Sequence, residues 1–259
     1  MNLRRIISAY TRYAYNMLSF DHATELFFWP LLDIFIWGIT IVWLQRFETT
    51  YSIVLPILTG LVFWQVVWRS NYEVSVNILK DLWARNFVNL FSTPLKTSEW
   101  IASLMLLGLT KNLITILFGA ACVYFLYSVN IFSLGFAFFP YLIALIIAGW
   151  WSGFISSSII VYFGQRMQMI AWVAGYVLSP FSAVFYPLSA LPSWCMPIAK
   201  ALPMTYVFEG IRQYYKTKIF DWQGYGLSMA LNAIYLCFSL WLFVSMFEKS
   251  REKGLARLE

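Results

Sequence analysis

The sequence predicts an all-α integral membrane protein with six transmembrane helices. Of its 259 residues, 61% are hydrophobic and only 12% are charged, and the mean hydropathy is +0.68. A water-soluble domain has too much surface for so few charged side chains to cover. A bilayer core of roughly 30 Å needs about 20 apolar residues per helical span, so the chain accommodates about six spans. Little length is left over, and we expect one transmembrane domain over residues 1–259.

Residues 1–20 are predicted to form an amphipathic interface helix. Apolar residues recur along this segment at helical spacing, while Arg4, Arg5 and Arg12 fall on the other side. Such a helix lies on the membrane surface with its basic side toward anionic lipid headgroups. Packing against protein is the alternative for the same pattern. The segment lacks a continuous apolar core and a small-residue cleavage site, so we expect no cleavable signal peptide.

Long apolar runs predict the transmembrane spans. The spans cover residues 26–44, 53–72, 101–127, 134–163, 167–188 and 225–247. Pro30 and Pro56 fall near the start or middle of the first two spans, where transmembrane helices tolerate proline. The polar residues 80–98 separate the second span from the third and include a Thr-Pro pair typical of a helix start. Residues 248–259 form a charged tail.

The fourth and fifth predicted spans are separated only by Gly164–Arg166, so we expect them to be antiparallel neighbours. Gly149 and Gly153 recur on one face of the fourth span, and Ala171 and Gly175 recur on one face of the fifth. Small residues allow helix backbones to approach closely in membranes. Contact with another subunit is the alternative for the Gly149 and Gly153 spacing.

The distribution of basic residues predicts the orientation of the chain. An even number of spans puts both termini on one side of the membrane. Lys and Arg are numerous near both ends of the chain and in residues 80–98, and basic residues concentrate in cytoplasmic loops. We therefore expect a multi-pass plasma membrane protein with both termini in the cytoplasm.

Several classes of function lack the residues that they need. The only histidine is His22 and the three cysteines are scattered, which excludes a histidine pair for a metal and a cysteine framework. There is no phosphate-binding GxxxxGK[ST] loop, and no basic run interleaves with aromatic residues as in nucleic-acid binding proteins. We expect no catalytic residue, no metal, no cofactor and no nucleic acid. If ATP powers transport, a separate chain must bind it.

Three charged residues fall inside or near the predicted spans: Asp33, Arg69 and Lys111. An isolated charge in mid-bilayer costs about 2.5 to 3.5 kcal/mol on insertion scales, so such residues face protein or water and find partners. We expect Asp33 to pair with Arg69 or Lys111. The group is a candidate polar gate near the cytoplasmic mouth of a pathway. A structural salt bridge, or a lysine that reaches the interface, is the alternative.

The segment before the last span is interrupted by prolines, namely Pro187, Pro192, Pro197 and Pro203. Each disfavours helix at the residue before it, yet the segment is too apolar for an open loop. Broken backbone at membrane depth must be buried in protein or line an aqueous cavity. We therefore predict a re-entrant helical hairpin over residues 189–212 on the outer side, with Glu209 and Arg212 one turn apart where it emerges. The two charges form either part of a gate or a local ion pair.

The order of these elements resembles the membrane subunits of type-2 ATP-binding-cassette exporters. The resemblance covers nearly the whole chain and rests on a polar helix ending NLFSTPLKTSEW and on the segment FSAVFYPLSALPSWCMPIAKALPMTYVFEGIRQ. In the second segment Tyr-Pro, Leu-Pro-x-Trp, Leu-Pro-Met-Thr and Glu-x-x-Arg follow in the order seen in the family. The family includes permeases for O-antigen and teichoic-acid glycans and for some drugs and antibiotics.

The resemblance implies a half-transporter rather than an enzyme. Two copies would form the pore, and each would dock on a separate cytoplasmic ATPase that binds ATP and Mg. Residues 80–98 would contain the coupling helix that contacts the ATPase, with Arg85, Asn86, Phe87 and Leu90 as candidate contacts. We expect an amphipathic or hydrophobic substrate (a drug, a lipid or a lipid-linked glycan). The alternative is a membrane-embedded enzyme or a structural multi-span protein with no ATPase partner.

Overall fold

The computed structural model describes residues 2–15, 23–47 and 54–252, and all regular structure in these ranges is helical. His22, residues 16–20 of the predicted interface helix, residue 53 of the second span and residues 253–259 of the tail lie outside the described residues. The α-helices are α1 (Leu3–Ala14), α3 (Trp29–Leu44), α4 (Val54–Trp83), α5 (Phe87–Ser92), α6 (Thr97–Tyr127), α7 (Phe138–Phe163), α8 (Met169–Leu178), α9 (Met196–Ala201), α10 (Pro203–Thr217) and α11 (Trp222–Glu252).

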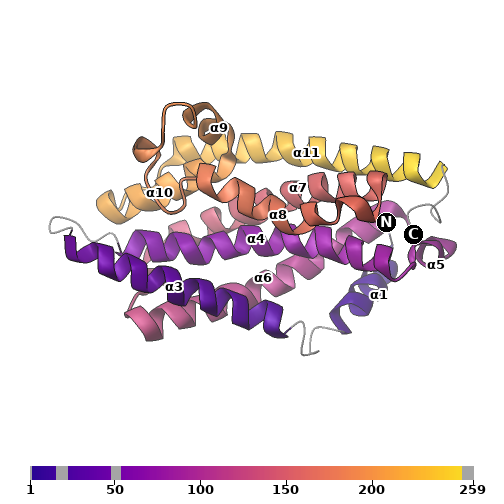
Figure 1. Ribbon diagram of the computed structural model, residues 1–259, viewed down its shortest axis with the longest axis horizontal. Helices are drawn as coiled ribbons and strands as arrows, with labels where there is room; N and C mark the ends of the chain where they lie inside the picture. Colours follow the sequence, from indigo (N-terminus) through magenta and orange to yellow (C-terminus); the bar gives the residue numbers. More distant parts are fainter. Residues whose placement is uncertain (1, 16–22, 48–53, 253–259) are drawn as a thin grey trace.

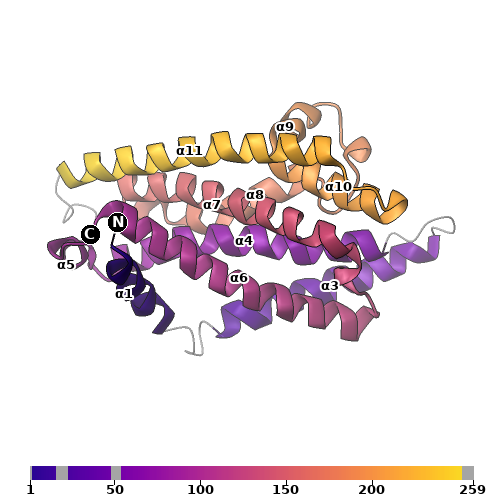
Figure 2. The same ribbon diagram turned by 180° about the vertical axis from the view of Figure 1, so that it is seen from behind.

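The long helices lie side by side in an elongated bundle (Figure 1). A π-helical turn, η2 (Thr24–Phe28), leads directly into α3. We name the two ends of the bundle by the elements they hold. The α5 end holds α1, α5 and the last turns of α11, and the α9 end holds α9, α10 and the turn between α6 and α7 (Figures 1 and 2).

Helix α4 forms the centre of the bundle. From Leu58 to Leu82 every residue is buried except Trp68 and Lys80. Helices α3, α6, α7 and α8 pack around it, and Figures 1 and 2 show α3 and α8 on one face of α4, with α6 on the other. A helix with polar residues in its second half is therefore enclosed by protein rather than by lipid or water.

The small residues of the fourth and fifth predicted spans allow close approach to α4. A Cβ atom on Gly149 would lie 2.3 Å from Cβ of Ser70, and one on Gly175 would lie 2.9 Å from Cδ1 of Trp68. Helices α7 and α8 do pack against each other. Gly149 of α7 and Gly175 of α8, which were expected to join these two helices, face α4 instead. Helix α4 packs against both α7 and α8.

Four of the described helical segments are long and apolar enough to cross a membrane. They are Thr24–Phe47, Thr97–Tyr127, Ile131–Phe163 and Trp222–Glu252, and they correspond to the first, third, fourth and sixth predicted spans. Helix α4 is less apolar because its second half is polar, and α8 has only 10 residues, so neither is among the four. The second and fifth spans, and with them the number six, stay predictions.

The polar region 80–98 does not form one helix. Helix α4 continues to Trp83, α5 is a separate helix of 6 residues, and α6 already begins at Thr97. The break lies at Arg85, which has a left-handed φ of 50°. Helix α4 continues beyond residue 72, where the predicted second span ends, because its polar second half remains helical inside the bundle.

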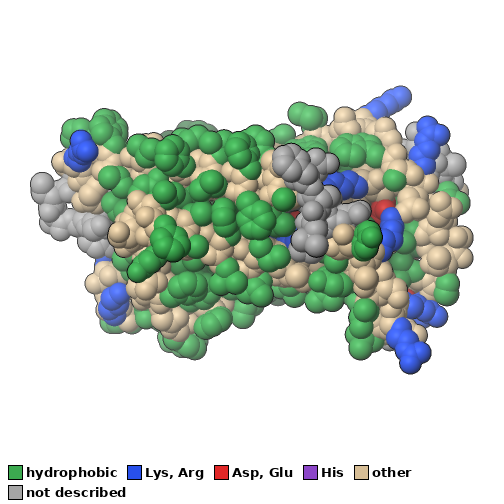
Figure 3. Space-filling view, turned by 90° about the horizontal axis from the view of Figure 1, so that it is seen from below, with side chains coloured by type: hydrophobic (Ala, Val, Ile, Leu, Met, Phe, Trp, Pro, Cys, Tyr) green, Lys and Arg blue, Asp and Glu red, His purple; other side chains and the backbone are tan. Residues whose placement is uncertain are grey.

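The surface matches a bilayer environment. Figure 3 shows hydrophobic side chains over the middle of one face, with most Lys and Arg side chains toward the two ends and more of them at the α5 end. Several aromatic side chains are among the exposed ones, including Phe35, Trp37 and Trp43 of α3. Contiguous apolar surface of this kind is stable against lipid or another protein. The chain is a multi-pass membrane protein.

The proline-rich segment folds into short helices at the α9 end (Figure 1). Pro197 and Pro203 lie in the first positions of α9 and α10, where the missing N–H of proline costs no helical hydrogen bond. Pro187 precedes a 3-10 turn, η7 (Leu188–Ala190). The segment thus contains α9, with 6 residues, and α10, with 15 residues, and the re-entrant hairpin stays a prediction.

Candidate functional site

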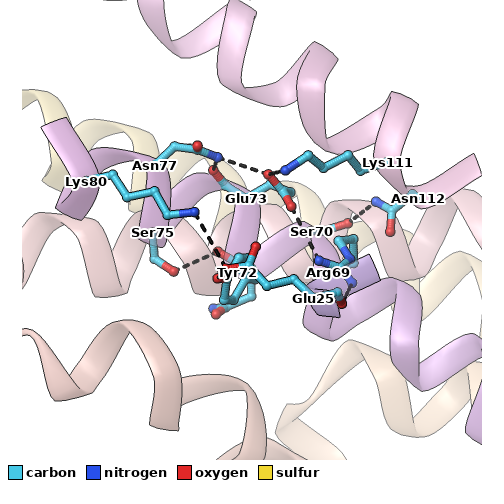
Figure 4. Close-up of polar contacts among 11 residues, drawn as sticks. Glu25, Arg69, Ser70, Tyr72, Glu73, Ser75, Asn77, Lys80, Lys111 and Asn112 are labelled. Atoms are coloured by element: carbon cyan, nitrogen blue, oxygen red, sulfur yellow. Dashed lines mark hydrogen bonds and ion pairs between the residues drawn. The ribbon is translucent and has the colours of Figure 1, made fainter. Parts of the chain in front are cut away.

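A buried cluster of charged side chains joins α4 to α6. The carboxylate of Glu73 lies 2.8 Å from Nζ of Lys111 and 3.5 Å from Nη1 of Arg69. The three side chains are at most 2% exposed. Asn77 Nδ2 donates a further hydrogen bond of 3.0 Å to Glu73 (Figure 4). Buried charges are stable only when they are paired and hydrogen bonded, and here one carboxylate compensates two cations.

The predicted pairing of Asp33 with Arg69 or Lys111 is wrong. Both cations contact Glu73, and the Asp33 carboxylate instead accepts a hydrogen bond of 2.9 Å from Gln65 Nε2. Glu73 was not counted among the charges inside the spans because it follows the predicted end of the second span at residue 72. The spacing of Arg69 and Glu73, four residues apart on a helix, is the signal that could have revealed the pair.

A second carboxylate lies beside this cluster, at the start of the first span. Tyr72 Oη donates a hydrogen bond to Glu25 Oε1, and Nζ of Lys80 lies 3.6 Å from the same oxygen. Arg69 Nη2 donates to the main-chain carbonyl of Glu25. These contacts attach the π-helical turn η2 to α4 (Figure 4). No pattern in the sequence placed Glu25 here.

Helix α5 is anchored to the bundle by an aromatic side chain. Phe87 is fully buried, and its ring packs edge-on against Trp100 of α6 and Phe247 of α11, with centroids 5.8 and 6.3 Å away. Phe87 thus packs α5 against both α6 and α11.

The four candidate coupling residues divide by exposure. Arg85 is exposed, Asn86 and Leu90 are partly buried, and Phe87 faces the interior. Phe87 therefore cannot contact a partner in this conformation. Trp83 and Val88, which the sequence did not single out, are 44% and 51% exposed and lie within three residues of Arg85 in the chain. Exposed apolar residues beside a basic residue form a surface suited to a protein partner.

Helix α1 packs against the same end of the bundle. Arg12 forms an ion pair with Asp81 of α4, and Tyr13 donates a hydrogen bond to the same carboxylate. Burial raises the pKa of Tyr13, and the negative charge of Asp81 raises this pKa further, so the hydroxyl stays a neutral donor. Trp100 Nε1 of α6 donates to Tyr13 Oη over 2.8 Å. The predicted interface helix is thus attached to both α4 and α6.

The predicted pair of Glu209 and Arg212 does form, with 3.0 Å between Oε1 and Nη1. It is also more than a local pair. Arg212 Nη2 donates to the carbonyl of Val184 over 2.9 Å, and the backbone N–H of Leu188 donates to Glu209 Oε1 over 2.7 Å. The two side chains therefore hold the chain between α8 and α9 against α10.

The described residues include no group of three or more His, Cys, Asp or Glu that could hold a metal ion. A comparison with curated proteins found no match. Residues 14–215 match the ABC-2 type transporter family. This range covers well over half of the chain and runs from the end of α1 to α10, so it includes the charge cluster, α5 and the proline-rich segment. The chain therefore belongs to the ABC-2 type transporter family and is one of its membrane subunits.

Proposed function

We propose that the chain is the permease subunit of an ATP-driven exporter in the plasma membrane. Two copies form the pore, and each docks through its α5 end on a separate ATPase that binds ATP and Mg. An amphipathic or hydrophobic substrate then leaves the cytoplasm when ATP binding and hydrolysis shift the permease between closed and open states. Membership of the transporter family supports the reaction class, and the α5 end supports the coupling.

The observation that carries the proposal is the attachment of α5. The side chains of Trp83, Arg85 and Val88, at the end of α4 and the start of α5, are exposed. Phe87 of α5 is instead buried and packs against α6 and α11. A partner that moves the exposed side must therefore also move the long helices. Because α4 ends at Trp83 and α6 begins at Thr97, the same movement reaches the charge cluster between these two helices.

Orientation follows from the same end. The greater number of basic side chains toward the α5 end in Figure 3 favours placing it in the cytoplasm. The α9 end is then external, which makes the hairpin an outer closure of the pore. Helix α4, with 30 residues, is about 45 Å long at 1.5 Å per residue and has the length to cross the bilayer.

Co-purification tests the proposal. The permease is expressed with an ATPase that carries Walker motifs and is encoded beside it. We expect a stable complex, and we expect Val88→Asp to release the ATPase because it places a charge in an apolar contact. The matched control is Ile219→Asp, which changes an exposed apolar residue of 66% exposure at the opposite end. If no ATPase binds the wild-type permease, the exporter assignment fails. If both variants release the ATPase equally, α5 is not the contact.

A further inference from the structure

A cavity of about 230 Å³ opens between the start of the first span, α4 and α8. One carboxylate and five aromatic rings line it, contributed by Glu25, Trp29, Trp68, Tyr72, Trp172 and Tyr176. Trp68 is one of the two residues between Leu58 and Leu82 of α4 that are not buried. Its ring reaches the cavity because Gly175 leaves room for it on α8. Aromatic faces attract cations, and a carboxylate adds a full negative charge.

Only one of the two carboxylate oxygens of Glu25 has partners among the described residues. Its Oε1 atom contacts Tyr72 and Lys80, whereas Oε2 is buried and has no hydrogen-bond partner within the described part of the chain. A buried oxygen without a donor is costly. A ligand that brings a donor or a positive charge into the cavity would remove this cost.

The cations nearby do not fill the site. Arg69 is engaged with Glu73, and its guanidinium lies 5.4 Å from the Trp68 ring and 5.7 Å from the Tyr72 ring. It therefore opposes a second cation on those two rings and leaves the other three for a ligand. Lys80 stands 3.6 Å from Glu25 with its side chain 35% exposed, and such a pair in contact with solvent is weak enough to exchange.

A second carboxylate adds to the negative charge. Asp33 lies eight residues after Glu25, a spacing that falls on one side of a helix. Gln65 donates a hydrogen bond to Asp33, and no Lys or Arg of the described ranges forms an ion pair with it. Asp33 on α3 thus adds an acidic side chain without an ion pair to the helical segment that begins with Glu25 in η2.

We propose that this cavity binds an organic cation, a protonated amine or onium group on an apolar body, with Glu25 as its counter-ion. The rings of Trp29, Trp172 and Tyr176 surround the cation, and Asp33 draws it further along α3. As a statement about the exported substrate, this rests on the proposed function. It selects one chemical class, apolar cations, from the drugs, lipids and glycans that the family transports.

The test uses two ions of matched size and shape but opposite charge. The full-length permease is placed in nanodiscs of zwitterionic lipid, and binding of tetraphenylphosphonium and tetraphenylborate is measured against empty nanodiscs. We expect saturable binding of the phosphonium alone. Equal binding of both ions, or binding of the borate alone, overturns the proposal. Displacement of the phosphonium by an alkyl maltoside at equal concentration also overturns it, because the rings would then be a sugar-stacking surface.

Variants locate the site. Glu25→Gln should weaken phosphonium binding by about tenfold or more, the loss expected when a buried charged contact disappears. Glu248→Gln is the matched control, since Glu248 forms an exposed pair with Arg251 on α11 and should leave binding unchanged. Equal losses in both variants, or none in Glu25→Gln, overturn the assignment.

A second pair keeps the test valid if Glu25→Gln fails to fold. Trp172→Leu should weaken binding by about threefold, and Trp172→Phe should restore part of it, because only a ring supplies the cation–π attraction. Equal binding by the two variants contradicts the site. None of these binding measurements involves an ATPase, so a negative result leaves the exporter proposal intact. Conversely, a permease that binds the cation but never an ATPase disproves the exporter alone.

Discussion

The charge cluster yields a stability prediction with a definite sign. Arg69, Lys111 and Glu73 together carry one net positive charge, and all three are at most 2% exposed. Glu73→Gln raises this to two and leaves two buried cations without an anion. Breaking a buried pair in this way costs about 3 to 5 kcal/mol. Lys111→Met removes one charged hydrogen bond but leaves Arg69 paired with Glu73, so it should cost only about 2 kcal/mol.

The decisive measurement is the double variant. In the Glu73→Gln background Lys111 is an uncompensated cation, so its replacement by Met should recover stability. We expect Glu73→Gln to lower the unfolding midpoint by about 10 °C in detergent or nanodiscs, and the double variant to unfold at a higher temperature than Glu73→Gln alone. A double variant that is less stable than Glu73→Gln would show that Lys111 contributes through packing, and the charge argument would be refuted.

Other predictions follow from packing. Gly149→Ala places a methyl group 2.3 Å from Ser70 Cβ and should lower the free energy of unfolding by about 1 to 3 kcal/mol. The control Gly226→Ala meets nothing within 4 Å and should be neutral or stabilising. Equal thermal unfolding midpoints of the two variants would contradict the close contact at Gly149. Phe87→Ala should cost about 3 to 5 kcal/mol and reduce ATP-driven transport more than ATPase binding, and full coupling in this variant would show that the aromatic anchor is dispensable. Replacement of Pro192 and Pro197 by Ala should raise leak or lower export if the hairpin closes the pore, as measured with dye-loaded proteoliposomes; unchanged permeability and transport would remove that role.

The apolar spans could be predicted from the sequence because lipid imposes a simple composition. The first predicted span, 26–44, lies within Thr24–Phe47, and the third, 101–127, lies within Thr97–Tyr127. The second half of α4 could not be found in this way. Its polar residues resemble those of a loop, and only the helices packed around it show that Glu73 is buried.

Contacts between residues that are far apart in the chain could not be predicted from the sequence either. Phe87 was chosen as a coupling contact by position, but its aromatic neighbours Trp100 and Phe247 turn it inward. Trp68 and Trp172 meet at one cavity only because α8 returns alongside α4. A count of aromatic residues showed that they were abundant, and it could not show which of them share a surface.

ATP-driven transport in reconstituted proteoliposomes is the decisive test of whether the chain is an exporter permease. The permease and its ATPase are inserted together, and the movement of tetraphenylphosphonium from the ATPase side is followed after addition of ATP and Mg. We expect transport that stops when the Walker lysine of the ATPase is replaced. We also expect Glu248→Gln, but not Glu25→Gln, to transport at the wild-type rate. If ATP drives no transport of this cation or of any neutral amphiphile or glycan-lipid, with the ATPase bound and hydrolysing, the chain is not an exporter permease.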